Sequence, residues 1–184
     1  MKDIKKLFID VGVGTPNSEA WSREKDFTII GFEPDTNRYN NLKNIYPGEL
    51  LNVVVSDRSG EIECWEDSKE GVVLFLGEGL GENFKKVKKE TIKLDGLDWK
   101  DFDEIHIWGD IEGSELLMLK GTIEILSSGK VKWINLEIRK NPPIEGWATA
   151  KQVYDFLDKH GFKTEVSLNQ LHEKKHKDVI FVPK

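Results

Sequence analysis

Two acidic residues, Asp110 and Glu112, stand two positions apart in the chain. They follow an apolar run at 105–108, which predicts a buried strand, and Ser114 after them predicts the cap of a helix. Folding alone explains such a pair poorly, because carboxylates avoid the protein interior. Paired acids at the end of a strand can bind a metal ion, accept a proton or hold a cation. This stretch is therefore a candidate active site.

A second candidate site lies near the amino terminus. A short apolar run contains Asp10 and leads into a turn with Gly12 and Gly14, and the next apolar run ends at Glu33 and Pro34. Strand, glycine turn, helix, strand and acid form the layout of a nucleotide-binding βαβ unit. In that unit the glycines let the backbone approach the ligand, and the acid accepts the ribose hydroxyls. The alternative is a tight turn that binds nothing.

The glycine turn departs from the dinucleotide fingerprint, whose third glycine would fall at Asn17. Without that glycine a pyrophosphate cradle is not supported, and a ligand with an adenosine but no phosphates fits better. S-adenosylmethionine is such a ligand. We expect Asp10 near its ammonium group, the backbone amides after Gly12 near its carboxylate, and Glu33 on its ribose.

Two further segments follow the βαβ unit. The sequence predicts a helix over 36–46, and an apolar run at 50–55 predicts a third strand that ends at Ser56 and Asp57. In a parallel sheet these two residues would lie at the adenine edge of the cofactor site. Asp57 also opens an ordinary hairpin signal, and both interpretations remain open.

Bulk properties limit the class of protein. The chain has 184 residues, enough for a single domain over 1–184 with a core of its own. Its net charge of −6 favours neither nucleic acid nor an anionic membrane as a partner. Cys64 is the only cysteine, and no apolar stretch has the length of a membrane span or a signal peptide. We therefore expect a cytoplasmic protein and make no prediction of its oligomeric state.

The pattern changes at about 61–94. Alternating and apolar runs there are separated by glycines, which predicts a β-rich insertion or a flap over the site. Lysines gather at positions 85, 86, 88 and 89. They predict a solvated face, with phosphate binding as the alternative.

A fifth strand of the main fold is predicted at 131–138, with Glu137 near the ligand edge. The Pro- and Gly-bearing loop at 139–147 follows it and predicts a lid. Trp147 in this loop is a candidate platform for the face of a sugar, with local packing as the alternative.

The end of the chain predicts a helix closed by Gly161 and then a terminal hairpin with strands at 163–168 and 178–182. His172 and His176 fall in the connecting loop of that hairpin. We expect both histidines to face water. A metal site would require this loop to be helical, because only then do residues four apart share a face.

Short motifs along the chain match those of a known family in sequence order. They are IDVG at 9–12, FEPD at 32–35, Ser56 and Asp57 with Gly60, Thr91 with Leu94 and Asp95, DIEGSE at 110–115 with LKG at 119–121, LEI at 136–138 and KDVIFV at 177–182. On these motifs the chain resembles the FkbM family of S-adenosylmethionine-dependent methyltransferases. The resemblance implies an α/β class I methyltransferase fold, which is Rossmann-like, with a mostly parallel seven-stranded sheet and an antiparallel terminal hairpin. It also implies O-methylation, typically of a hydroxyl on a sugar or a natural product.

Three features depart from the family pattern. Val13 and Gly14 stand where the family usually has alanine and asparagine, so we expect another path for the loop that holds the methionine part of the cofactor. Trp108 stands where the family commonly has a lysine, so any role of that lysine is absent. The chain also begins almost at its first strand, without the N-terminal helices that often cover the acceptor site, which predicts an open acceptor pocket.

Methyl transfer to a hydroxyl needs alignment and removal of a proton, and a general base contributes about 10²–10⁴-fold. Asp110 and Glu112 are the candidate bases, with Glu137 and His106 behind them. His106 alternates with apolar neighbours, which favours a structural role. In the alternative, Asp110, Glu112 and Glu137 hold Mg²⁺ or Mn²⁺, which would lower the pKa of the acceptor hydroxyl. The expected cofactor contacts are Asp10, Gly12, Gly14, Asn17, Glu33, Pro34, Ser56, Asp57 and Asp110.

Functions of three different classes are compatible with these residues. The leading one is an O-methyltransferase that acts on a small-molecule or glycan acceptor. A nicotinamide-dependent oxidoreductase is second, and the missing third glycine disfavours it. The third is a module that binds the cofactor without turnover, or that forms part of a larger assembly.

Overall fold

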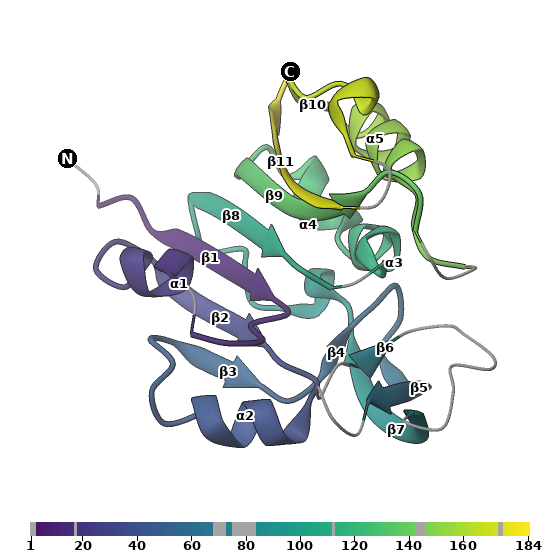
Figure 1. Cartoon of the computed structure of the whole chain (residues 1–184). Helices are drawn as coiled ribbons and strands as arrows, with labels where there is room; N and C mark the ends of the chain where they lie inside the picture. The colour runs from purple at the N-terminus through teal and green to yellow at the C-terminus, as the bar shows by residue number, and fades with distance from the viewer. Residues whose placement is uncertain are drawn as a thin grey trace.

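The main sheet has seven strands in a computed structural model that describes residues 3–16, 18–67, 73–74, 84–111, 113–142, 146–172 and 175–184. From one edge to the other the order is β10, β11, β9, β8, β1, β2 and β3 (Figure 1). The bounds are β1 Lys6–Val11, β2 Thr28–Phe32, β3 Glu49–Leu51, β8 Glu104–Gly109, β9 Val131–Arg139, β10 Phe162–Lys163 and β11 His176–Pro183. Only β11 runs against the others, because it is antiparallel to both of its neighbours. The predicted mostly parallel fold is confirmed.

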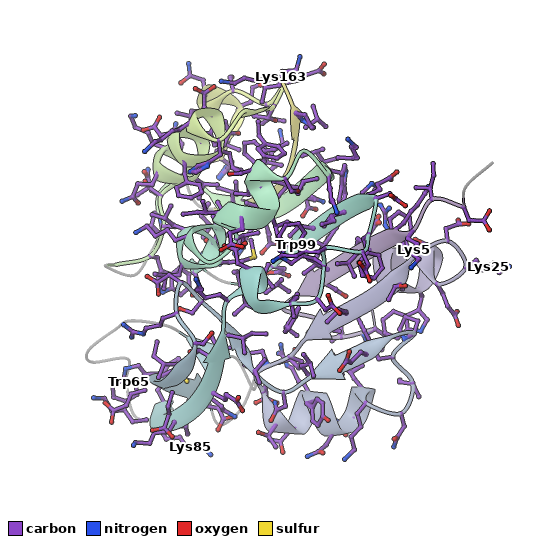
Figure 2. The ribbon with its side chains drawn as sticks, turned by 180° about the vertical axis from the view of Figure 1, so that it is seen from behind. Lys5, Lys25, Trp65, Lys85, Trp99 and Lys163 are labelled. Atoms are coloured by element: carbon purple, nitrogen blue, oxygen red, sulfur yellow. The ribbon has the colours of Figure 1, made fainter. Side chains whose placement is uncertain are left out.

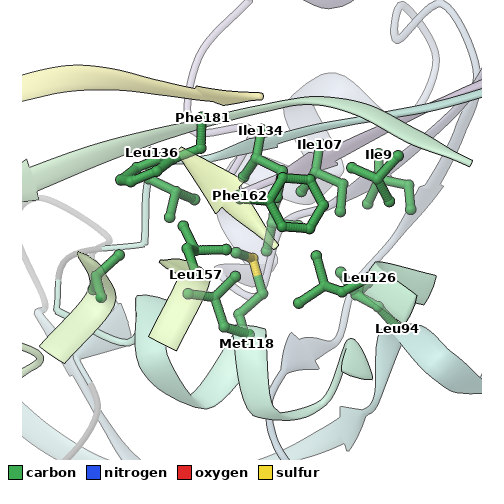
Figure 3. Packing of buried hydrophobic residues seen from close by; sticks show 14 of the residues in the cluster. Ile9, Leu94, Ile107, Met118, Leu126, Ile134, Leu136, Leu157, Phe162 and Phe181 are labelled. Carbon is green, nitrogen blue, oxygen red and sulfur yellow. The ribbon is translucent and has the colours of Figure 1, made fainter. Parts of the chain in front are cut away.

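Helices cover both faces of this sheet, because its central strands are apolar on both sides. On one face Leu7 and Ile9 of β1 pack against α3 (Glu115–Lys120), α4 (Ile123–Ser127) and α5 (Ala150–Lys159), as Figure 3 shows for Ile9, Met118, Leu126 and Leu157. On the other face Phe8 packs with residues of α1 (Ser18–Arg23) and α2 (Thr36–Leu42). None of the described helices is long and apolar enough to cross a membrane.

A second sheet lies beside the carboxyl ends of β2 and β3 (Figure 1). Its order is β4 (Val54–Val55), β7 (Phe84–Ile92), β5 (Gly60–Asp67) and β6 (Val73–Leu74). Among the residues that the structure describes, the insertion at 61–94 is therefore β-rich, as predicted. Its role as a flap over the site stays a prediction.

The lysines of β7 face acids of the neighbouring strand β5. Lys88 lies 2.8 Å from Glu61, Lys86 lies 3.7 Å from Glu63, and Lys85 lies 3.0 Å from Glu66. The pairs of Lys86 and Lys88 are exposed and contribute about 0–1 kcal/mol each. Glu66 is buried and also lies 3.5 Å from Lys89, whose side chain is only 12% exposed, so the predicted solvated face holds for Lys85, Lys86 and Lys88 but not for Lys89. Figure 2 shows Lys85 and Trp65 at the outer end of this sheet, apart from Trp99 in the body of the molecule.

The sequence predicted one strand for the apolar run at 50–55, but the structure has two. β3 ends at Leu51 and joins the main sheet, whereas β4 begins at Val54 and pairs in parallel with β7 of the second sheet. Because β4 has β7 as its neighbour and not β5, the turn before Gly60 is not a hairpin. The predicted helix at 36–46 is also shorter, since α2 ends at Leu42.

The single helix predicted after Ser114 is divided into α3 and α4 at Gly121 and Thr122. A Cβ on Gly121 would lie 2.1 Å from the Ser56 carbonyl oxygen, so the break lies where the backbone of the second sheet approaches closely. Asp95 supports the new helix start. Its carboxylate accepts hydrogen bonds of 3.0 Å from the backbone amides of Glu124 and Ile125. Ser114 itself makes no side-chain capping bond.

The terminal hairpin differs from the prediction in length. β10 contains only Phe162 and Lys163, so most of the predicted strand at 163–168 lies outside it, and Leu168 begins the short helix η2 (Leu168–Gln170). β11 begins earlier than predicted, at His176. The last helix, α5, ends before Gly161 as predicted.

We expect Asp95→Ala to lower the free energy of unfolding by about 1–2 kcal/mol, because two first-turn amides of α4 lose their acceptor. Denaturant unfolding measures this change. Asp98→Ala is the matched control, since Asp98 is exposed and lies three residues further on. Equal effects of the two substitutions would contradict the capping role of Asp95.

Candidate active site

The loops after β1 and β8 lie against each other at the carboxyl edge of the sheet. The Gly12 amide donates to the Phe32 carbonyl oxygen over 2.9 Å, and the Asp110 amide donates to the Val11 carbonyl oxygen over 3.0 Å. Gly12 has a φ of +83°, and a Cβ there would lie 2.0 Å from the Asp110 carbonyl oxygen. Glycine at position 12 is therefore what lets the two candidate stretches of the sequence meet.

Glu33 joins the glycine loop to the turn that follows β2. Its carboxylate accepts from the Gly14 amide over 2.6 Å and from the Asp35 amide over 2.8 Å. The side chain is buried, and this burial raises the pKa of Glu33 above its usual 4.5, although the two backbone bonds act against the shift. Each carboxylate oxygen can accept a further hydrogen bond, so the group has the acceptors that a ribose diol needs.

Asn52 holds the same turn from the other side. Its side-chain amide donates to the carbonyl oxygens of Glu33, over 2.7 Å, and Pro34, over 3.1 Å. The hydroxyl of Thr36 donates to the Asn52 side-chain oxygen over 3.3 Å. Sequence reasoning did not single out Asn52. The available signal was a polar residue inside the apolar run at 50–55.

Asp10 is buried on the face of the sheet that α1 and α2 cover, where the Tyr46 hydroxyl donates to its carboxylate over 2.9 Å. Burial and the nearby Asp10 raise the pKa of Tyr46, so the phenol stays protonated and keeps donating. Asp10 has no exposed surface. The predicted contact of Asp10 with the cofactor ammonium group stays a prediction.

Ser56 and Asp57 follow β4 of the second sheet and not a strand of the main sheet. The Ser56 amide donates to the Ile92 carbonyl oxygen over 2.9 Å, and its buried hydroxyl donates to Asp57 over 3.3 Å. Asp57 is exposed. A contact of either residue with the adenine stays a prediction.

Of the two acids in the loop after β8, the structure describes Asp110 but not Glu112. Asp110 is exposed at the carboxyl end of β8, beside Gly12, while Glu112 lies outside the described residues, as does Asn17 of the glycine loop. Within the described part of the chain, no three side chains of the metal-binding types come together. The proposed Mg²⁺ or Mn²⁺ site has no support in this part of the structure.

Trp147 is buried and packs against Gly113. A Cβ added to Gly113 would lie 2.2 Å from the indole ring of Trp147. The prediction of an exposed sugar platform is wrong, and the packing alternative is correct. The contact fixes the two loops, because the Ala148 amide also donates to the Gly113 carbonyl oxygen over 2.8 Å. Residues 143–145 of the predicted lid lie outside the described residues.

A narrow pocket opens beside this contact. The described residues that line it include Gly113, Glu115, Glu137, Trp147 and His176. The Nδ1 atom of His176 lies 2.5 Å from Oε2 of Glu137. His176 is therefore not in the connecting loop, as the sequence predicted, but is the first residue of β11, where it stays partly exposed and joins a carboxylate of β9.

His106 does not meet the acids of the site. Its Nδ1 lies 3.0 Å from the guanidinium of Arg23 and its Nε2 lies 2.8 Å from Glu104. Burial and the Arg23 charge lower the pKa of His106, so the ring is mainly neutral. It packs between Phe27 and Trp133 on the face that bears α1. These contacts agree with the structural role that the sequence favours, and a role of His106 as a base stays a prediction.

Comparison with known proteins agrees with this architecture. The sequence matches the methyltransferase FkbM domain over residues 10–164, so the chain belongs to the FkbM methyltransferase family. A search of curated protein sequences gave no match.

Two crystal structures share the fold at low sequence identity. Methyltransferase FkbM from Methylobacillus flagellatus KT aligns with a TM-score of 0.60 and 13% identity, over 98% of this chain and 44% of that one. A protein from Listeria monocytogenes, assigned provisionally as an S-adenosylmethionine-dependent methyltransferase, aligns with a TM-score of 0.52 and 8% identity, over 100% of this chain and 94% of that one. The chain spans less than half the length of the first protein.

We expect Gly12→Ala to destabilise the protein by about 2–4 kcal/mol, because a Cβ at that position would overlap the Asp110 carbonyl and the positive φ would strain the backbone. Gly96→Ala is the matched control, since no atom lies within 4 Å of its added Cβ. Thermal denaturation of both variants measures the difference. A Gly12→Ala variant as stable as Gly96→Ala would refute the close contact of the two loops.

Proposed function

We propose that this chain transfers a methyl group from S-adenosylmethionine to a hydroxyl of a sugar, a glycan or a similar polyhydroxy compound. The observation that carries the cofactor assignment is the Glu33 carboxylate, which connects the glycine loop and the turn after β2. Family membership supports the reaction class. The choice of a polyhydroxy acceptor rests on the resemblance to the FkbM family.

In this proposal Glu33 accepts the two ribose hydroxyls and the amides after Gly12 face the carboxylate of the amino-acid part. Pro34 lies in the turn that Asn52 fixes. Asp110 of the neighbouring β8 loop faces the reacting end, and Glu112 is the second candidate base. When bound, S-adenosylmethionine supplies a methyl group that its positive sulfur already activates. The protein then has to bind, orient and deprotonate the acceptor, and alignment alone can supply about 7–11 kcal/mol.

We also propose the partner of the protein and the compartment in which the reaction takes place. The acceptor is the only partner that we propose, because a net charge of −6 offers no general attraction for nucleic acid or an anionic membrane. Burial raises the pKa of Cys64 to about 11, so this thiol stays protonated and suits a structural role in the reducing cytoplasm.

We expect calorimetric titration to show micromolar binding of S-adenosylmethionine and S-adenosylhomocysteine, with no binding of NAD. Glu33→Ala should reduce this affinity by about 10- to 100-fold, because charge-assisted hydrogen bonds contribute about 1.5–3 kcal/mol. Glu90→Ala is a suitable control, since Glu90 is exposed in β7 of the second sheet. Binding of NAD in place of the sulfur ligands would favour the oxidoreductase.

An acceptor screen with and without Mn²⁺ would then test for turnover and metal dependence.

The affinity for S-adenosylmethionine should fall on acidification at a pH above the usual range of a glutamate. The pKa of Glu33 is raised in the ligand-free protein, so its carboxyl gains a proton as the pH falls toward 4.5 and can no longer accept both ribose hydroxyls. Glu33→Gln should bind weakly, with a smaller dependence on pH. Titrations between pH 5 and 8 test this, and an unchanged pH dependence in Glu33→Gln would contradict the assignment.

A further inference from the structure

A histidine and a carboxylate form a pair at the acceptor side of the site. Nδ1 of His176 lies 2.5 Å from the Glu137 carboxylate, and both side chains are partly exposed, at 25% and 29%. A carboxylate can only accept, so Nδ1 is the ring nitrogen that carries the proton. The lone pair of the neutral ring is then on Nε2. Among the residues that the structure describes, none makes a hydrogen bond to Nε2.

Strand register creates this pair. His176 is the first residue of β11 and lies opposite Arg139, near the end of β9, while Glu137 lies two residues earlier on β9. Residues two apart on a strand share a face, so Glu137 and His176 are diagonal neighbours. Both side chains therefore lie at the carboxyl end of β9. The loops after β1 and β8 begin at the same edge of the sheet, because the three strands are parallel.

The pair lines the same pocket as Gly113, which is three residues from Asp110 in the β8 loop. Asp110 is the residue that contacts Gly12 of the cofactor loop. The pocket is thus connected to the cofactor site through a single short loop. Glu115 forms part of its wall, and the buried carboxylate is held by the Gly113 amide over 3.0 Å.

The size of the pocket limits what enters it. It has room for a group about as large as one water molecule, with the Trp147 ring on one side. A whole sugar ring does not fit there, but a single hydroxyl does. The acceptor would therefore lie outside, in contact with the loops, and insert the hydroxyl that reacts.

We propose that His176 is the general base that takes the proton from the acceptor hydroxyl, and that Glu137 is the residue that positions it. This rests on the proposed function of the chain as an O-methyltransferase. The acceptor oxygen bonds to the methyl carbon, and the electron pair of the breaking carbon–sulfur bond stays on sulfur. The O–H proton passes to Nε2, and the imidazolium later loses it to water, so charge and atoms balance.

A histidine suits this step better than the exposed Asp110. General base catalysis is most efficient when the pKa of the base lies near the working pH, and an imidazole group generally meets that condition more closely than a carboxylate does. The Glu137 carboxylate also favours the cationic ring that forms, as the acid partner does in other histidine–carboxylate pairs.

The same pair could serve only to hold β11 against β9. The test therefore needs a measurement that would not change if the role of the pair were purely structural. We expect His176→Ala to lower kcat by about 10²–10⁴-fold, the usual contribution of a general base, in a screen of methyl glycosides as acceptors. Its affinity for S-adenosylmethionine should stay that of the wild type. Added imidazole should restore part of the turnover, because it can occupy the space of the missing ring. His172→Gln is the matched control and should keep full turnover.

Glu137→Gln provides the second comparison. Its amide oxygen can still accept from Nδ1, so we expect a smaller loss of kcat than in Glu137→Ala, with KM for S-adenosylmethionine unchanged in both. Nitrogen NMR of the histidine rings in the wild type should show that the neutral form of His176 carries its proton on Nδ1 and none on Nε2.

The outcomes separate the two proposals. Failure of the wild type to bind S-adenosylmethionine would overturn the proposed function. Full turnover in His176→Ala with cofactor binding intact, or a proton on Nε2 of the neutral ring, would overturn only the assignment of the base. A loss of kcat in His176→Ala that imidazole does not restore, together with a lowered melting temperature, would assign the pair to the structure of the sheet.

Discussion

At position 12 a Cβ would lie 2.0 Å from the carbonyl oxygen of Asp110. The absence of a side chain there lets the loops after β1 and β8 touch, although nearly a hundred residues separate them. The backbone bond from the Asp110 amide to the Val11 carbonyl oxygen fixes the same contact. Parallel strands bring their carboxyl ends to one edge of the sheet, and this contact brings the glycine loop and the acidic loop into a single site.

The buried carboxylate of Glu33 is the second link in that site. Burying a charge is costly, and the raised pKa of Glu33 is the sign of that cost. The protein offsets part of it with the amides of Gly14 and Asp35, and Asn52 fixes the backbone on the other side. A carboxylate that is held in this way is ready to accept hydroxyl groups without reorganisation, which is what a binding site for a ribose requires.

The proposed acceptor side depends on β11, the one strand of the main sheet that runs against the others. Because β11 is antiparallel to β9, its first residue lies at the carboxyl edge, where β9 ends. His176 therefore joins Glu137 there, beside the buried contact of Trp147 with Gly113. In our proposal the cofactor side and the acceptor side therefore lie next to each other, with the β8 loop between them.

The sequence by itself determined the order of the elements, the glycine loop, the acid after β2 and the family, because these depend on local apolar periodicity and on short motifs. It could not show that the run at 50–55 divides between two sheets, that the helix after Ser114 breaks at Gly121, or that Trp147 is buried. Each of these depends on the close approach of segments far apart in the chain. The tertiary structure alone decided that Asn52 holds the Glu33 turn, that His106 is bonded to Arg23 and Glu104, and that His176 meets Glu137. Hydrogen bonds between distant residues follow from strand register and packing, which no local pattern encodes.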